Sequence, residues 1–162
     1  MQLIAEISKA FSLEPVPSGP LLEAEFLNPA AQGDDGAADY FSGKRWDSLD
    51  VQGLLYHSDA LFMFTPEVHR YYLPAFMKAA LEHPEDADVI PDNILFHFSE
   101  FEDPFWSKRI RALSAPQREV VAGFLRTSAD AVLDREWLEP ALRGLASGGQ
   151  MPNTSLERTR EG

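Results

Sequence analysis

The chain has 162 residues, of which 26 are acidic and 14 are lysine or arginine, so its formal net charge is −12. A hydrophobic share of 44% predicts one soluble globular domain, and the lack of cysteine excludes disulfides, thiolate metal sites and a cysteine nucleophile. The acidic balance argues against nucleic-acid binding, because contacts to phosphates require clustered lysine and arginine.

The N-terminal segment has the spacing of an amphipathic helix rather than the pattern of a signal peptide. Residues 1–15 carry Glu6 and Lys9 within their apolar pattern and lack a basic start followed by a continuous apolar run. No stretch of the sequence is apolar for long enough to span a membrane. We therefore expect a cytoplasmic protein that does not bind membranes.

Short helices are expected in the first third of the chain. Apolar spacing predicts a helix over residues 3–13, which Pro15 would end, and a second short helix over residues 21–27. The small, acidic and glycine-containing residues 30–44 predict a surface loop. A further helix is expected to begin with Asp47 as its N-cap and to reach residue 56.

The central segment, residues 61–82, predicts a helix buried on nearly every face. Thr65 can cap this helix and Pro66 suits its first position, whereas Pro74 removes a backbone hydrogen bond and predicts a kink. A helix that is apolar almost all round belongs in the middle of a core. Residues 60–64 just before it fit either a buried connector or a single short strand.

The C-terminal half predicts three more structured segments. Residues 92–101 have helical spacing, although the alternation within 92–98 also permits a strand. Residues 100–113 are interpreted as a solvated connection whose charges neutralise one another. Ser114 and Gln117 form a capping box for the next helix, and a last helical pattern covers residues 136–145.

Together these segments predict an all-α fold with at most a minor β element. We expect a single helical domain over residues 1–147, with five to seven helices around the proline-kinked central helix. Residues 148–162 are polar and contain glycine, and they predict a disordered C-terminal tail.

No catalytic, metal or cofactor motif is present. The four histidines recur at intervals of twelve to fourteen residues, whereas two metal ligands on one helix face lie three or four residues apart. There is no nucleophile elbow and no glycine loop that would hold a phosphate. We therefore expect no catalytic residue, no metal and no cofactor.

The densest group of polar and aromatic side chains lies at the start of the central helix. Glu67, His69, Arg70 and Tyr71 are candidate binding residues, because tyrosine and arginine are enriched in binding hot spots. The competing interpretation is that the aromatic side chains pack in the core with their polar atoms satisfied internally, and this interpretation is favoured.

Two segments of the chain resemble a known family. The segment TPExxRYYLPAFM at residues 65–77 and the segment LSxxQxxVVxxFL at residues 113–125 are similar to a family of small acidic bacterial proteins of unknown function. The resemblance covers about residues 45–130. It implies an α-rich soluble domain, assigns no catalytic residue, and suggests for some members a role beside toxin systems.

The sequence therefore favours a non-enzymatic protein-interaction module, such as an immunity-type inhibitor of a basic toxin or enzyme. The motivation is the charge of residues 1–106, which hold 19 acidic and 5 basic side chains, a net of −14. The alternative is a small enzyme or ligand-binding protein with a pocket beside the helix of residues 66–82. In that case Arg70 would bind an anion and Tyr71 or His69 would donate a proton.

Overall fold

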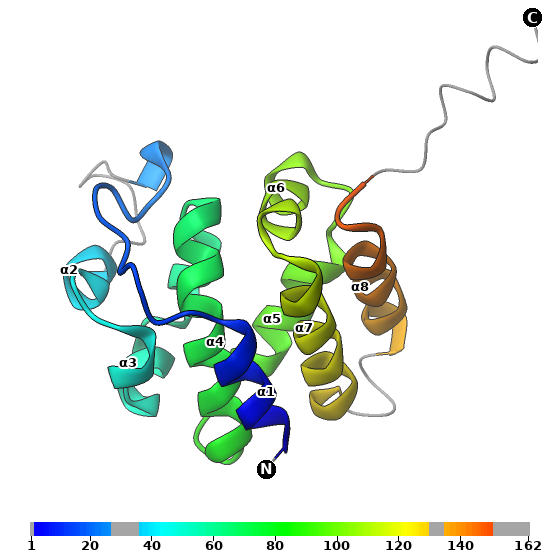
Figure 1. Ribbon diagram of the computed structural model, residues 1–162, viewed down its shortest axis with the longest axis horizontal. Coiled ribbons are helices and arrows are strands. Elements are labelled where there is room, and N and C mark those ends of the chain that lie inside the picture. The colour runs from blue at the N-terminus through cyan, green and yellow to red at the C-terminus, as the bar shows by residue number, and fades with distance from the viewer. Residues whose placement is uncertain (1, 27–35, 130–134, 151–162) are drawn as a thin grey trace, which may run out of the picture.

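The computed structural model describes residues 2–26, 36–129 and 135–150, and these residues form an all-α fold (Figure 1). Their α-helices are α1 (Gln2–Ala10), α2 (Ala37–Phe41), α3 (Val51–Tyr56), α4 (Pro66–Glu82), α5 (Ile90–Ser99), α6 (Pro104–Ala112), α7 (Ala115–Ser128) and α8 (Arg135–Ser147). The 3-10 helices are η1 (Ala24–Phe26), η2 (Trp46–Ser48) and η3 (Ser58–Phe62). The predicted all-α fold is confirmed, with eight α-helices in the described residues where five to seven were expected.

Helix α4 lies in the middle of the fold, as the sequence predicts. The Thr65 side chain accepts a hydrogen bond from the Val68 backbone N–H at 3.4 Å, and Pro66 occupies the first turn. The helix continues through Pro74 as one element and packs against α1, α3, α5 and α6. Ten of its residues are buried, Phe76 among them, so α4 supplies side chains to the core on several faces.

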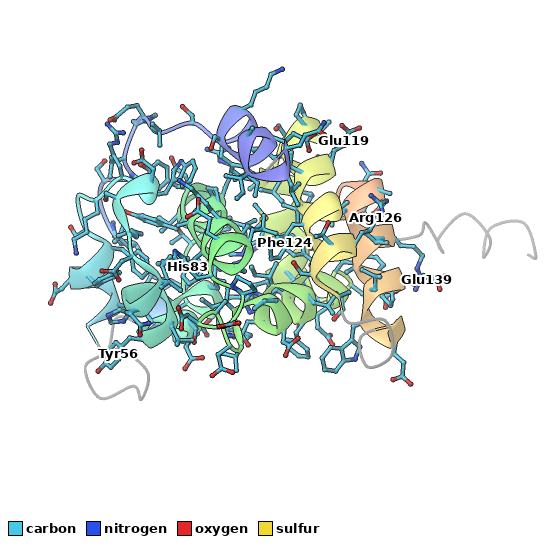
Figure 2. All side chains as sticks on the ribbon, turned by 90° about the horizontal axis from the view of Figure 1, so that it is seen from below. Tyr56, His83, Glu119, Phe124, Arg126 and Glu139 are labelled. Atoms are coloured by element: carbon cyan, nitrogen blue, oxygen red, sulfur yellow. The ribbon has the colours of Figure 1, made fainter. Side chains whose placement is uncertain are left out.

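The C-terminal helices form the other part of the fold. Helices α5, α7 and α8 pack against one another, and α1 packs against both α7 and α4 (Figure 1). Figure 2 shows Phe124 of α7 among the side chains at the centre of the molecule, and this side chain is fully buried. One hydrophobic core therefore extends through both parts.

An isolated antiparallel bridge pairs Leu22 with Phe64 and is the minor β element that the prediction allows. Two backbone hydrogen bonds support it, from Glu23 N–H to the Met63 carbonyl at 2.8 Å and from Thr65 N–H to the Leu21 carbonyl at 3.1 Å. The helix expected over residues 21–27 is wrong, because this pairing holds the segment extended and only η1 follows; residue 27 lies outside the described residues. Residues 60–64 are the end of η3 followed by this bridge.

The surface loop expected over residues 30–44 is wrong where the structure describes it. Residues 37–41 form α2, and Phe41 is fully buried with its ring 5.1 Å from the Phe64 ring and 4.9 Å from the Tyr72 ring, measured between centroids. The Tyr72 hydroxyl contacts the carbonyl oxygens of Phe41 at 2.6 Å and Lys44 at 2.8 Å. Burial of the Phe41 ring thus orders a segment whose composition indicates a loop. Residues 30–35 lie outside the described residues.

Helix α3 is capped by Asp50 and not by Asp47. The Asp50 carboxylate accepts a hydrogen bond from the Gly53 backbone N–H at 2.7 Å, whereas Asp47 lies in η2 and pairs with Arg45 at 2.9 Å. The predicted N-cap was therefore three residues too early, because Trp46 and Asp47 belong to η2, which precedes the helix.

The remaining segments are helical. Residues 92–98 belong to α5, so the strand alternative is wrong. The connection expected over residues 100–113 is also wrong, because α6 occupies most of it. The Asp103 carboxylate caps this helix by accepting a hydrogen bond from the Phe105 N–H at 2.9 Å.

The predicted capping box of Ser114 and Gln117 is confirmed at the start of α7. Helix α8 ends at Ser147, and residues 151–162 of the expected tail lie outside the described residues.

Candidate functional site

Three of the four predicted binding residues lie on one shallow groove beside α4. Glu67, Arg70 and Tyr71 line a cavity of about 140 Å³ whose other walls come from the segment directly after α1 and from the start of α7. These further residues are Phe11, Ser12, Glu14, Pro15, Pro17 and Gln117. The sequence therefore brings together an arginine, a tyrosine hydroxyl and carboxylates, as the ligand-binding alternative requires.

The polar groups of this groove also make bonds that hold the fold together. The Tyr71 hydroxyl donates to the Leu13 carbonyl at 2.8 Å, and Arg70 Nη1 donates to the Ala112 carbonyl at 3.3 Å. Within the described residues, Arg70 forms no ion pair with Glu67. Because the groove is small beside typical ligand pockets of about 300–1,000 Å³, its tyrosine and arginine serve first to attach the segment after α1 and the end of α6 to α4.

His69 does not join this groove. It lies on the buried side of α4, where its ring is 6.3 Å from the ring of His97 on α5 and 6.3 Å from that of Trp106 on α6. His97 stacks on Trp106 with centroids 4.2 Å apart. Burial, and then the charge of Arg109, lower the pKa of His69 to about 3, and burial lowers the pKa of His97 well below its ordinary value. At neutral pH both rings are therefore uncharged, and His69 has no access to a ligand in the groove.

Arg109 is the polar residue that sequence reasoning placed wrongly. Its side chain is 1% exposed and its Nη2 contacts both the Glu23 carboxylate at 3.0 Å and the Phe64 carbonyl, while Nη1 donates to the Phe105 carbonyl at 2.6 Å. The guanidinium also lies 3.5 Å from the centroid of the Phe105 ring. Arg109 therefore links α6 to the bridge between Leu22 and Phe64, a role that no local spacing indicates.

A row of aromatic rings reaches the surface at the contact between α5 and α8. We call Phe62, Phe96 and Trp137 the aromatic patch. The Phe96 ring lies 5.7 Å from the Trp137 ring and 6.5 Å from the Phe62 ring, between centroids. Phe96 is 38% exposed and Trp137 is 42% exposed. Neither Phe96 nor Trp137 is among the binding residues predicted from the sequence, and helical spacing alone does not show that they would lie outside the core.

The described residues contain no group of three or more histidine, aspartate or glutamate side chains placed to hold a metal ion. Among the same residues, no helix combines the length and apolarity that crossing a membrane requires. Neither finding assigns a chemical activity.

Comparison with known proteins gives one match. No curated protein and no solved structure matches the chain. A family model described as a family of unknown function matches residues 23–145, which include the whole region of the expected resemblance. The resemblance to a family of unknown function is thereby confirmed, whereas the two motifs and a bacterial origin stay predictions. The chain belongs to the family of unknown function DUF6714.

Proposed function

We propose that the protein is a non-enzymatic protein-binding module whose partner carries a basic surface. The observation that supports this most directly is the uneven charge of the chain. Residues 1–106 carry 19 acidic and 5 basic side chains, whereas residues 107–147 carry 5 acidic and 7 basic side chains. A surface with one prevailing charge attracts partners of the opposite charge and speeds their association.

The fold concentrates this charge outside the core. The turn between α4 and α5 exposes Glu85, Asp86 and Asp88. Arg109, by contrast, is enclosed, so one of the cations that would offset this charge lies in the interior. Because Arg109 pairs there with the Glu23 carboxylate, its burial leaves the acidic excess of the outer surface unchanged.

An immunity-type inhibitor is the specific form of this role that we favour. A protein that blocks a basic toxin or enzyme by covering it needs a complementary acidic surface and no chemistry of its own. The groove beside α4 supports this form over ligand binding. Its Tyr71 and Arg70 already donate hydrogen bonds to backbone carbonyls of the protein itself.

The test is capture of the partner by the full chain in its native host, followed by binding measurements with the purified partner. We expect a basic partner whose affinity falls as salt rises from about 0.05 M to about 0.5 M, because salt screens charges on the surface. Recovery of acidic partners alone, or an affinity that does not change with salt, would contradict the proposal.

Two triple variants that change the net charge equally distinguish the effect of a local acidic surface on binding from the effect of the total charge. The first, E85Q/D86N/D88N, removes the carboxylates of the turn before α5. The second, E6Q/E14Q/E119Q, removes three carboxylates from α1, the segment after it and α7. We expect the first variant to slow association with the partner more than the second.

The alternative, a ligand-binding protein or small enzyme, rests on the groove of Glu67, Arg70 and Tyr71. Its test is a thermal-shift screen with phosphate and with small carboxylates. A reproducible rise in melting temperature with one anion, lost in an Arg70→Ala protein that still folds, would favour this alternative.

A further inference from the structure

We infer that the aromatic patch is the surface on which the basic partner docks, and that arginine or lysine side chains of that partner lie against its rings. This inference rests on the proposed function and names the surface that carries it. It is drawn from the exposure of the patch, from the acidic residues around it and from the packing beneath it.

The exposure of the patch is unusual for this chain. Among the described residues, the large hydrophobic side chains that are exposed are Tyr56, Val89, Phe96 and Trp137. Phe96 and Trp137 touch each other, and Val89 lies seven residues before Phe96, close to two helical turns away on the same face. Large apolar side chains gathered in this way mark an interaction surface more often than scattered ones do.

The charges around the patch favour a cationic occupant. Asp59 is exposed and lies three residues before Phe62 in η3, where side chains three apart lie on the same side. Glu100 is exposed four residues after Phe96, and Glu136 is exposed next to Trp137. The elements η3 and α5 contain no lysine and no arginine, whereas α8 contains Arg135 and Arg143 as well as Glu136 and Glu139. A basic segment would therefore meet carboxylates on each element that forms the patch.

The rings themselves suit the same occupant. Aromatic faces attract guanidinium and ammonium groups, and tryptophan does so most strongly. Phe62 also contacts the buried pair beneath the surface, with its ring 3.9 Å from the His97 ring and 5.9 Å from the Trp106 ring. The patch thus rests on packed side chains, which lowers the entropy that binding must overcome.

The test titrates the isotope-labelled full chain with two peptides of equal length, one alternating glycine with arginine and the other alternating glycine with glutamate. Nuclear magnetic resonance reports the indole N–H of each tryptophan. The chain has three tryptophans, and Trp46 serves as an internal reference because it is buried and its Nε1 donates to the Ser12 carbonyl. We expect the Trp137 signal to shift to saturation with the arginine peptide only.

Matched variants locate the binding. Phe96→Ser and Trp137→Gln should weaken binding of the arginine peptide about tenfold, as removal of a hot-spot residue does. Tyr56→Ser is the control, because Tyr56 is 71% exposed and Figure 2 shows it at the opposite end of the molecule from Glu139 of α8. This variant should bind like the wild type, and circular dichroism should show all three variants folded.

The outcomes distinguish this inference from the proposed function. If the arginine peptide binds while the Trp137 signal and both patch variants are unaffected, the patch is wrong and binding elsewhere on the acidic surface remains. Binding of neither peptide overturns the patch. So does patch-dependent self-association, seen by analytical ultracentrifugation, because the occupant is then a second copy of the chain. In these two cases the capture experiment still tests the proposed function by itself. If a patch variant fails to fold, the shift of the Trp137 signal in the wild type still tests whether the arginine peptide binds at the patch.

Discussion

Arg109 carries a permanent charge into a position where almost no water reaches it. Its neighbours Glu23, Phe64 and Phe105 supply one carboxylate and two carbonyl oxygens, so the charge is compensated by groups from three separate segments. Removal of Arg109 leaves the buried Phe64 carbonyl and the partly buried Glu23 carboxylate without this partner, which costs more than the loss of one contact.

Arg109→Ala should therefore lower the free energy of unfolding by about 3–5 kcal/mol. Lys108→Ala is the control, because Lys108 is the exposed neighbour and a surface change of this kind stays within about 0.5 kcal/mol. Urea denaturation monitored by circular dichroism measures both values. Equal midpoints for the two variants would show that the buried guanidinium does not stabilise the fold.

The two buried histidines make stability depend on pH. The pKa of His69 falls from 6.5 to about 3 on folding, chiefly through burial, and that of His97 also falls well below 6.5. The unfolded chain thus binds a proton at His69 between about pH 3 and pH 6.5, where the folded protein does not, and the same difference at His97 begins below pH 6.5. Their contribution to stability is complete above pH 6.5 and is lost as the pH falls below it, by up to about 1.4 kcal/mol per histidine for each pH unit.

The free energy of unfolding should accordingly drop between pH 6.5 and pH 5, before most carboxylates titrate. The group to vary is His97, because phenylalanine can keep the stack on Trp106. His97→Phe should reduce the slope of stability against pH by about half in this range. An unchanged slope in a folded variant would show that the pKa of His97 does not fall on folding.

At the scale of elements, α8 is held close to the chain before α6 by a glycine. A side chain at Gly144 would place its Cβ 2.6 Å from the Cβ of Phe101, whereas a Cβ at Gly123 in α7 would meet only the end of the Leu3 side chain at 3.6 Å. Both glycines lie inside helices, where alanine is ordinarily favoured by about 0.5–1 kcal/mol.

The two substitutions should therefore change stability in opposite directions. Gly144→Ala should destabilise the protein by about 1–3 kcal/mol through overpacking. Gly123→Ala should stabilise it by a few tenths to about 1 kcal/mol. Thermal denaturation of both variants decides the matter, and a higher melting temperature for Gly144→Ala would mean that α8 can move away from Phe101 at little cost.

The elements that the sequence predicts correctly are those with local signals. The cap at Thr65, the apolar stripes of α4 and the capping box of α7 depend on residues within one helical turn of one another. The errors fall where distant residues decide the structure. Phe41 orders α2 by packing on Phe64 and Tyr72, and Arg109 is buried because Glu23 reaches it from far along the chain.

For the candidate site too, local spacing predicted some features and contacts between distant residues decided the others. Glu67, Arg70 and Tyr71 lie on one groove because residues three and four apart share a helix face. His69 points to the core, and the acceptors of Arg70 and Tyr71 come from α6 and from the segment after α1, which local spacing could not reveal. The contact of Phe96 with Trp137 depends on how α5 meets α8, so the aromatic patch was beyond sequence reasoning.

At the scale of the whole molecule, a net charge of −12 makes the compact state repel itself. Sodium chloride screens this repulsion, so the melting temperature should rise as salt increases from about 0.02 M to about 0.3 M. The E85Q/D86N/D88N variant should show a smaller rise, because less repulsion is left to screen. A melting temperature that falls with salt would show that native ion pairs outweigh the repulsion.

The bridge between Leu22 and Phe64 has a consequence for how the chain tolerates change in length. The segment between these residues contains α2 and α3, whose side chains belong to the core, and it returns to the same point, where Arg109 binds both sides through Glu23 and the Phe64 carbonyl. Residues inserted within the segment need not displace α4, because its start is fixed by the bridge and not by the path of the chain before it. The entropy of closing a longer loop grows only slowly with length. We therefore expect that relatives of this protein can differ in length between these two residues, outside α2 and α3, while they keep the helices that follow in place.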